Sequence, residues 1–126
     1  MHEFLPATLD SVASARRAVR RFALDLEVDV DGMVLAVSEA VANVVAHAYV
    51  EDTNGVVELS AAASPLEVTV TVRDRGRGLA RGKGTPGAGY GLLIIRRLAQ
   101  HVELADTRDG VALTMAFRRG GVWSAS

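Results

Sequence analysis

The sequence contains no cysteine among its 126 residues, only three prolines, and few aromatic side chains, which make up 5% of the chain. The absence of cysteine excludes a disulfide framework, a thiolate zinc site and a thiol nucleophile. The scarcity of aromatics argues against a surface that stacks nucleic-acid bases. No run approaches the roughly 20 apolar residues that a membrane-spanning helix needs. We therefore expect a cytoplasmic protein that binds neither a membrane nor nucleic acid directly.

The chain also lacks an excess of either charge, since 14 Lys and Arg oppose 15 Asp and Glu to give a net charge of -1. A domain that binds a polyanion over its whole surface usually carries a clear basic excess. The charge is unevenly placed, however: residues 1–72 hold 4 basic and 11 acidic residues, and residues 73–126 hold 10 basic and 4 acidic. Such an asymmetry points to a charged partner on one side of the molecule.

A length of 126 residues fits a single domain, which we expect to span residues 1–126. Apolar residues at helical spacing predict a helix that begins near residues 8–11 and ends near residue 26, and further helices over residues 32–49 and 92–101. Alternation of apolar and polar residues predicts strands over residues 56–61, 66–73, 102–105 and 111–117. Runs of this kind favour an α+β fold, a two-layer sandwich with helices on one face of a mostly antiparallel sheet.

Two segments rich in glycine connect these elements. Residues 74–91 contain seven glycines and one proline without periodicity, which predicts a loop of functional length. Asp109 and Gly110 form a hairpin dipeptide between the last two strands.

The second predicted helix carries the first candidate site residues. Glu39, Asn43 and His47 recur at a spacing of four, so they line one stripe of an α-helix. The alanines beside this stripe leave room for a ligand. A carboxylate and an amide oxygen one turn apart could hold a Mg²⁺ ion completed by phosphate oxygens, and the carboxylate could activate an attacking hydroxyl. A solvated helix face is the alternative explanation.

Two further motifs follow in the glycine-rich stretch. Asp74 opens the motif Asp-x-Gly-x-Gly at the predicted end of a strand, and its ionised carboxylate could accept a hydrogen bond from the exocyclic amine of adenine. The motif that begins at Gly87 leads into a helix, where glycine amides and the helix N-terminus together suit phosphate groups. Taken separately, the first could be only a turn and the second only a linker.

Taken together, the three motifs resemble the N box and the two glycine-rich boxes of the GHKL ATP-binding superfamily. That superfamily contains gyrase-type ATPases, a heat-shock chaperone ATPase, sensor histidine kinases and anti-sigma factors. The short chain, the compact spacing of the boxes, and the segments 38–43 and 91–98 are most similar to the anti-sigma factor serine kinases.

The resemblance implies the Bergerat fold, with ATP and Mg²⁺ bound between the second helix and the glycine-rich segment. It implies that Glu39 is the general base, Asn43 the Mg²⁺ ligand and Asp74 the residue that reads adenine. The remaining implied nucleotide-binding residues are His47, Gly76, Gly78, Gly87, Gly89, Tyr90, Gly91 and Leu92. Tyr90 departs from the Arg or Leu more usual at its position, which leaves the local conformation open.

The same resemblance implies partners. Family members bind a sigma factor and phosphorylate a serine of an anti-anti-sigma antagonist protein, and the likeness is compatible with a homodimer. A face of the first helix that carries Arg16, Arg17, Arg20 and Arg21 is either solvated or a protein-binding surface. Two functions stay open: a serine/threonine protein kinase that sequesters a sigma factor, and a non-catalytic protein-binding module that uses nucleotide as a conformational ligand. Glu39 favours the kinase, because a module that only binds needs no base.

Overall fold

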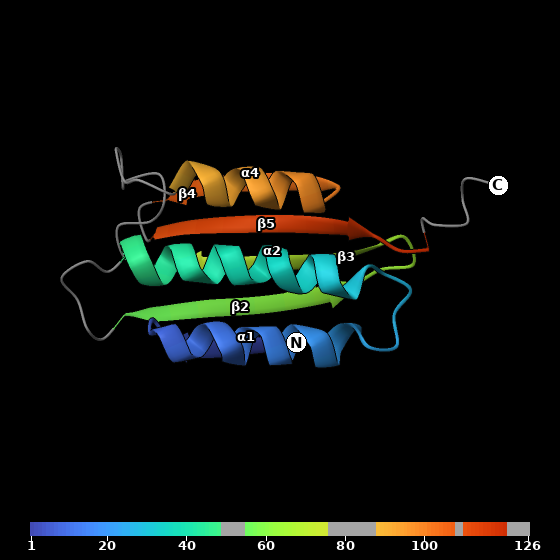
Figure 1. Ribbon diagram of the computed structural model, residues 1–126, viewed down its shortest axis with the longest axis horizontal. Coiled ribbons are helices and arrows are strands. Elements are labelled where there is room, and N and C mark those ends of the chain that lie inside the picture. The colour runs from blue at the N-terminus through green and yellow to red at the C-terminus, as the bar shows by residue number, and fades with distance from the viewer. Residues whose placement is uncertain (49–54, 76–87, 108–109, 121–126) are drawn as a thin grey trace.

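A sheet and a layer of helices make up the computed structural model, which describes residues 1–48, 55–75, 88–107 and 110–120 (Figure 1). The sheet has five strands in the order β1-β2-β3-β5-β4, and every neighbouring pair is antiparallel. The strands are β1 (His2–Pro6), β2 (Val56–Ala63), β3 (Glu67–Asp74), β4 (His101–Thr107) and β5 (Gly110–Arg118).

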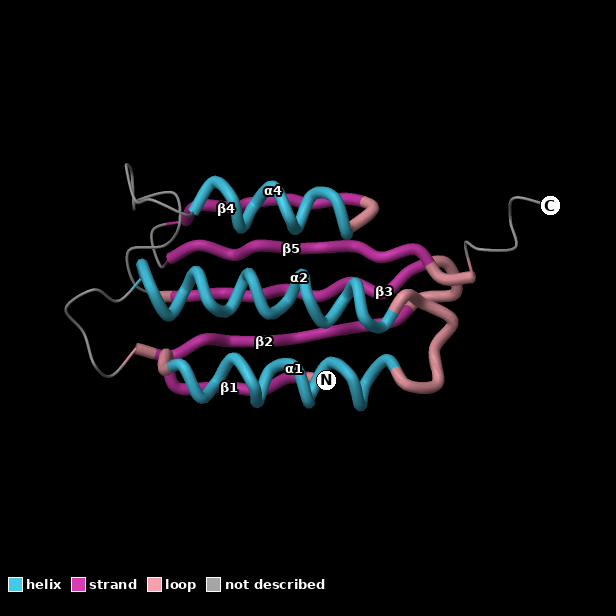
Figure 2. The backbone as a smooth tube through the Cα atoms, viewed as in Figure 1, coloured by secondary structure: helices cyan, strands magenta, loops and turns pink. Residues whose placement is uncertain are grey.

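The helices of the described residues all lie on one face of this sheet (Figure 2). They are α1 (Leu9–Ala23), α2 (Val30–Asn43), which continues into a π-helical turn η1 (Val44–Ala48), and α4 (Ala88–Leu98). The central helix α2 packs against α1 on one side and α4 on the other. The predicted α+β two-layer sandwich is therefore confirmed.

Side-chain alternation along the strands builds the core between the two layers. On β3, the valines at 68, 70 and 72 are buried, whereas Thr69 and Thr71 between them are only half-buried. Val70 pairs with Met115 of β5, so the buried side chains of adjacent strands form continuous rows beneath the helices. The opposite face of the sheet carries polar pairs, such as the hydrogen bond of 3.2 Å between the hydroxyls of Thr71 and Thr114.

Helix α2 begins at an N-cap supplied by Asp29, whose Oδ1 accepts a hydrogen bond of 3.1 Å from the backbone N–H of Gly32. The helix is buried on several sides because α1 and α4 flank it. Ala36 and Ala40 are buried in the hydrophobic core. These two alanines therefore allow close packing within the core, whereas the other two beside the predicted stripe are accessible: Ala42 is half-buried and Ala46 is exposed.

Several element boundaries differ from the predictions, and two of the differences affect candidate site residues. The helix predicted over residues 32–49 is α-helical only as far as Asn43, after which the π-helical turn η1 follows. The loop predicted over residues 74–91 ends earlier, because α4 begins at Ala88. Gly89, Tyr90 and Gly91 are therefore helical, and residues 76–87 of the predicted loop lie outside the described residues.

In the described parts of the chain, none of the helices combines the length and the apolar character that a bilayer-spanning segment requires.

Candidate functional site

One end of the sandwich brings together the ends of several elements (Figure 1). The C-terminal end of α2, the first turn of α4, the last residue of β3 and the first residue of β5 all lie there, at the left of the view. These segments are far apart in the sequence, and the antiparallel connections of the sheet return them to the same end. Five of the predicted site residues belong to these segments: Asn43, Asp74, Gly89, Tyr90 and Gly91.

Asn43 is the last residue of α2 and its side chain is buried, with 8% of the residue exposed. Its Nδ2 atom is buried and has no hydrogen-bond partner among the described residues. A buried donor without an acceptor costs free energy, and an acceptor on a bound ligand would remove that cost. The amide is the clearest sign in the described residues that a polar ligand completes this site.

Gly91 of α4 packs directly on that amide. A methyl group added at Gly91 would lie 3.2 Å from Cγ and Oδ1 of Asn43, and closer still to Nδ2. Glycine in a helix costs about 1 kcal/mol relative to alanine, but here it allows α4 to approach α2 closely. The absence of a side chain at Gly91 therefore leaves room for the Asn43 amide.

Asp74 is the last residue of β3 and is only 1% exposed. It follows Val72 by two residues, so its side chain lies on the helix-facing side of the sheet. A carboxylate at a buried strand end is held by the sheet, which makes it a rigid hydrogen-bond acceptor. The prediction that Asp74 sits at the end of a strand, next to the glycine-rich segment, is confirmed.

Gly110 supports Asp74 in a way that sequence reasoning missed. It has φ 130°, a conformation that L side chains rarely adopt. A methyl group at this position would lie 2.7 Å from the carbonyl carbon of Asp74 and 2.7 Å from Cα of Arg75, and closer still to the carbonyl oxygen of Asp74. The dipeptide at 109–110 predicts a hairpin, and Gly110 does pair with Thr107, but its contact with β3 leaves no trace in local sequence.

Glu39 lies one helical turn before Asn43 on α2 and is half-buried. His47 lies in η1, beyond the end of the α-helical segment. A π-helical turn closes i→i+5 hydrogen bonds and has more residues per turn than an α-helix, so the regular α-helical repeat ends at Asn43. The structure brings Glu39 and Asn43 onto one helix end.

The other predicted nucleotide-binding residues fall into two groups. Gly89, Tyr90 and Leu92 belong to the first two turns of α4, and Leu92 is half-buried against the core. Gly76, Gly78 and Gly87 lie outside the described residues.

A Mg²⁺ ion fits the donor set at this end. The described residues contain no group of three or more His, Asp and Glu side chains that could hold a metal ion. Magnesium retains several waters and is bound through one or two protein oxygens plus substrate phosphates. The Oδ1 atom of Asn43 is an oxygen ligand of the kind that such a site uses, whereas its unsatisfied Nδ2 is a donor that suits an acceptor such as a phosphate oxygen.

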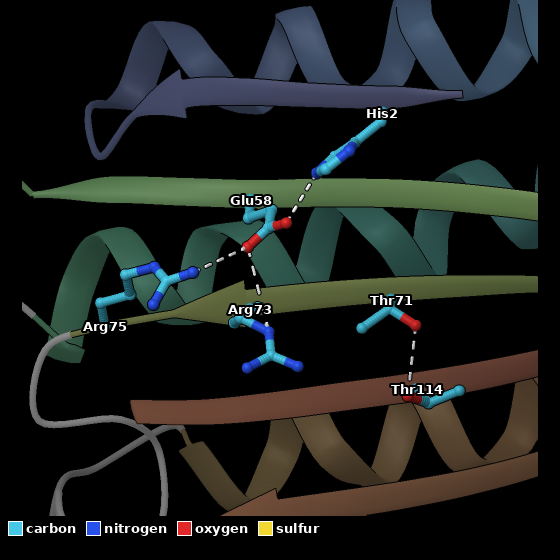
Figure 3. A network of polar contacts seen from close by, with 6 residues as sticks. All are labelled: His2, Glu58, Thr71, Arg73, Arg75 and Thr114. Carbon is cyan, nitrogen blue, oxygen red and sulfur yellow. Dashed lines mark hydrogen bonds and ion pairs between the residues drawn. The ribbon is translucent and has the colours of Figure 1, made fainter. Parts of the chain in front are cut away.

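The opposite face of the sheet carries an ionic cluster near the same end, centred on Glu58 of β2 (Figure 3). Its Oε2 lies 2.6 Å from Nε2 of His2, and its Oε1 lies 3.6 Å from Nη2 of Arg75 and 3.9 Å from Nε of Arg73. The Glu58 side chain is 21% exposed. Sequence reasoning placed Glu58 at a polar position of a strand but gave no sign of its three partners.

Comparisons with known proteins agree with the observed fold. A model of the histidine kinase-like ATPase domain matches residues 5–117. No curated protein matches the chain.

Several solved structures are similar in fold, including the two that follow. The structure of the RsbU and RsbW domains of Rv1364c from Mycobacterium tuberculosis aligns with a TM-score of 0.70 and 24% identity, over 94% of this chain and 32% of that one. The blue-light activated histidine kinase of Erythrobacter litoralis EL346 aligns with a TM-score of 0.64 and 20% identity, over 94% of this chain and 43% of that one. The chain thus spans less than half the length of either.

The family model covers nearly the whole chain, and the sandwich has the architecture that the GHKL resemblance implies. The chain belongs to the histidine kinase-like ATPase domain family.

Proposed function

We propose that this protein is an ATP-dependent serine/threonine protein kinase that phosphorylates an anti-anti-sigma antagonist and also sequesters a sigma factor. The observation that carries the proposal is the end of α2, where the half-buried Glu39 precedes the buried side chain of Asn43 by one turn. A base beside a metal ligand is the pairing that phosphate transfer to a hydroxyl needs. The similarity to a structure containing an RsbW domain supports the anti-sigma assignment.

In this proposal the buried carboxylate of Asp74 accepts a hydrogen bond from the adenine amine. The strand end fixes the carboxylate, so the base binds with little loss of side-chain freedom. Asn43 would hold Mg²⁺ through its amide oxygen, where a bound ion would supply positive charge to the phosphates. The first turn of α4 contributes the positive end of its helix dipole toward the phosphates.

Glu39 takes the proton of the substrate hydroxyl as the hydroxyl oxygen attacks the γ-phosphorus. A bond forms between that oxygen and phosphorus, the bond to the β–γ bridging oxygen breaks, and ADP leaves. Most of the catalysis in such a reaction comes from positioning and charge stabilisation. Glu39 is therefore required for transfer and contributes little to nucleotide affinity.

The test is transfer of labelled phosphate from Mg·ATP to candidate antagonist proteins from the same genome. Glu39→Gln keeps the size of the side chain but removes the base, so we expect transfer to fall by about 100-fold or more. ATP affinity, measured by calorimetry, should change less than about threefold, because a base contributes mainly to the transition state. An antagonist whose acceptor serine is replaced by alanine controls for labelling elsewhere.

Each outcome decides between the two functions. Transfer that depends on Glu39 supports the kinase. Tight ATP binding with no transfer to any antagonist, and with sigma-factor binding that responds to nucleotide, would instead identify a non-catalytic module. Undiminished transfer by Glu39→Gln would eliminate Glu39 as the base.

We also propose that the basic face of α1 binds the protein partner. Four exposed arginines lie on this helix: Arg16, Arg17, Arg20 and Arg21. The last three line a surface pocket together with Leu24, which is 70% exposed. Arg20 also pairs with Asp31 at 3.2 Å. A cationic rim around an exposed apolar side chain suits an acidic partner surface that carries an apolar residue.

Charge reversal tests this surface. Arg17→Glu with Arg21→Glu should weaken sigma-factor binding by about 10-fold or more, and the loss should shrink at high salt. The matched control is Arg96→Glu with Arg97→Glu, which reverses two exposed arginines on α4. Equal losses in the two double variants would show that only net charge matters and would overturn the assignment of α1. A homodimer stays a prediction, which analytical ultracentrifugation tests directly.

A further inference from the structure

The ionic cluster around Glu58 lies on the face of the sheet that the helices leave uncovered (Figure 3). The carboxylate contacts His2 of β1, Arg73 of β3 and Arg75, so it joins three segments of the chain. Its Oε1 atom is buried and accepts no hydrogen bond within the described structure. Its stabilisation therefore comes from the two guanidinium groups at 3.6 and 3.9 Å.

The positions of these arginines matter because they flank Asp74. Glu58 is the register partner of Arg73, and the preceding residue, Val57, is the register partner of Asp74. Alternation along β3 directs Asp74 toward the helices and Arg73 toward the uncovered face. Glu58 thus contacts the residue before Asp74 and the residue after it. These contacts lie on the face of the sheet opposite to the Asp74 carboxylate.

Gly110 contacts the same stretch of backbone from β5. Its φ of 130° and the absence of a side chain allow it to approach the carbonyl group of Asp74 and Cα of Arg75. The backbone of Asp74 is therefore bounded by β5 on one side, and its two neighbours are held by Glu58 on β2. Two independent contacts converge on one residue of the proposed nucleotide site.

We propose that Glu58 is a positioning residue for nucleotide recognition, which holds Asp74 in register by pairing with the arginines on either side of it. This inference rests on the proposed role of Asp74 as the adenine acceptor. Glu58 lies on the uncovered face of the sheet and does not touch the nucleotide. Its effect on ATP binding passes entirely through the backbone of β3.

The first test compares two matched variants. Glu58→Gln removes the negative charge at the centre of the cluster. The control, Glu103→Gln, removes the negative charge of an exposed pair on the same face, in which Oε1 of Glu103 lies 3.5 Å from Nε2 of His101. Calorimetry with Mg·ATP should show about three- to tenfold weaker binding for Glu58→Gln, the effect of a small ionic network. Glu103→Gln should bind ATP like the wild type. Equal affinities in the two variants would overturn the proposal.

A double-mutant cycle separates positioning from a general structural role. If Glu58 acts through Asp74, then Glu58→Gln should cause no further loss of ATP affinity in the Asp74→Asn background. Multiplied losses would show that Glu58 acts independently, and would refute the proposal. Should Glu58→Gln fail to fold, Arg73→Gln breaks the same cluster from β3 and should weaken ATP binding in the same direction.

These results also separate the inference from the function on which it rests. A wild-type protein that binds no ATP would refute the proposed function and this inference with it. ATP binding that depends on Asp74 but is indifferent to Glu58→Gln and Arg73→Gln would leave the proposed function intact and refute the positioning role alone.

Discussion

The contact between Gly91 and Asn43 makes a sharp prediction for the substitution Gly91→Ala. In an exposed helix this change would stabilise the protein by about 1 kcal/mol, because alanine has the higher helix propensity. Here the new methyl group would meet the buried amide of Asn43, with Cγ and Oδ1 at 3.2 Å. Overpacking a well-packed interior costs about 1–3 kcal/mol. The two effects together predict a net destabilisation of zero to about 2 kcal/mol.

The displaced amide should also affect ligand binding. If Asn43 is the protein's ligand for Mg²⁺, then moving it should weaken Mg·ATP binding by about 10-fold or more, since tenfold corresponds to about 1.4 kcal/mol. Urea denaturation measures the change in stability, and calorimetry measures the affinity. Binding of ATP without Mg²⁺ should fall less, because the adenine contact at Asp74 is unaffected.

The background Asn43→Ala provides the internal control. Removing the amide removes the obstacle, so Gly91→Ala should then stabilise the protein by about 1 kcal/mol, as in an exposed helix. The coupling between the two positions should therefore be about 1–3 kcal/mol. A Gly91→Ala variant that is more stable than the wild type and binds Mg·ATP equally well would refute the packing argument.

Four further substitutions test other parts of the account. Asp74→Asn should weaken ATP binding by about 10- to 100-fold, the effect of one hydrogen bond to a charged group, and unchanged calorimetric affinity would eliminate Asp74 as the adenine acceptor. Asp29→Ala removes the N-cap of α2 and should cost about 0.5–2 kcal/mol of stability in urea denaturation; no loss would show that the cap contributes nothing. Met115→Ala empties a fully buried position opposite Val70 and should lower the free energy of unfolding by about 2–5 kcal/mol. Thr114→Ala on the uncovered face should lower it by about 1 kcal/mol, the value of the hydrogen bond between Thr114 and Thr71.

The fold could be predicted where a single periodic pattern decides the structure. The alternation over residues 66–73 predicts β3 to within one residue at each end, because that strand buries one face and exposes the other. The position of Asp74 at the strand end follows from the same pattern. The order of helices and strands then sufficed for the two-layer sandwich.

The remaining features depend on contacts between distant segments. The glycines at 89 and 91 predict a loop by propensity, yet both lie in α4, which begins at Ala88. The packing of Gly91 on Asn43 joins two segments that are distant in sequence. The approach of Gly110 to Asp74 joins residues that are far apart in sequence, so no local pattern reports it. The π-helical turn after Asn43 likewise has no counterpart in the apolar periodicity.

The most direct test of the central claim is a structure determined with Mg²⁺ and a non-hydrolysable ATP analogue. We expect the exocyclic amine of adenine within hydrogen-bond distance of the Asp74 carboxylate, about 2.7–3.2 Å, and the metal ion about 2.0–2.1 Å from the amide oxygen of Asn43. A nucleotide bound elsewhere on the molecule, or a metal ion that Asn43 does not ligate, would contradict the account.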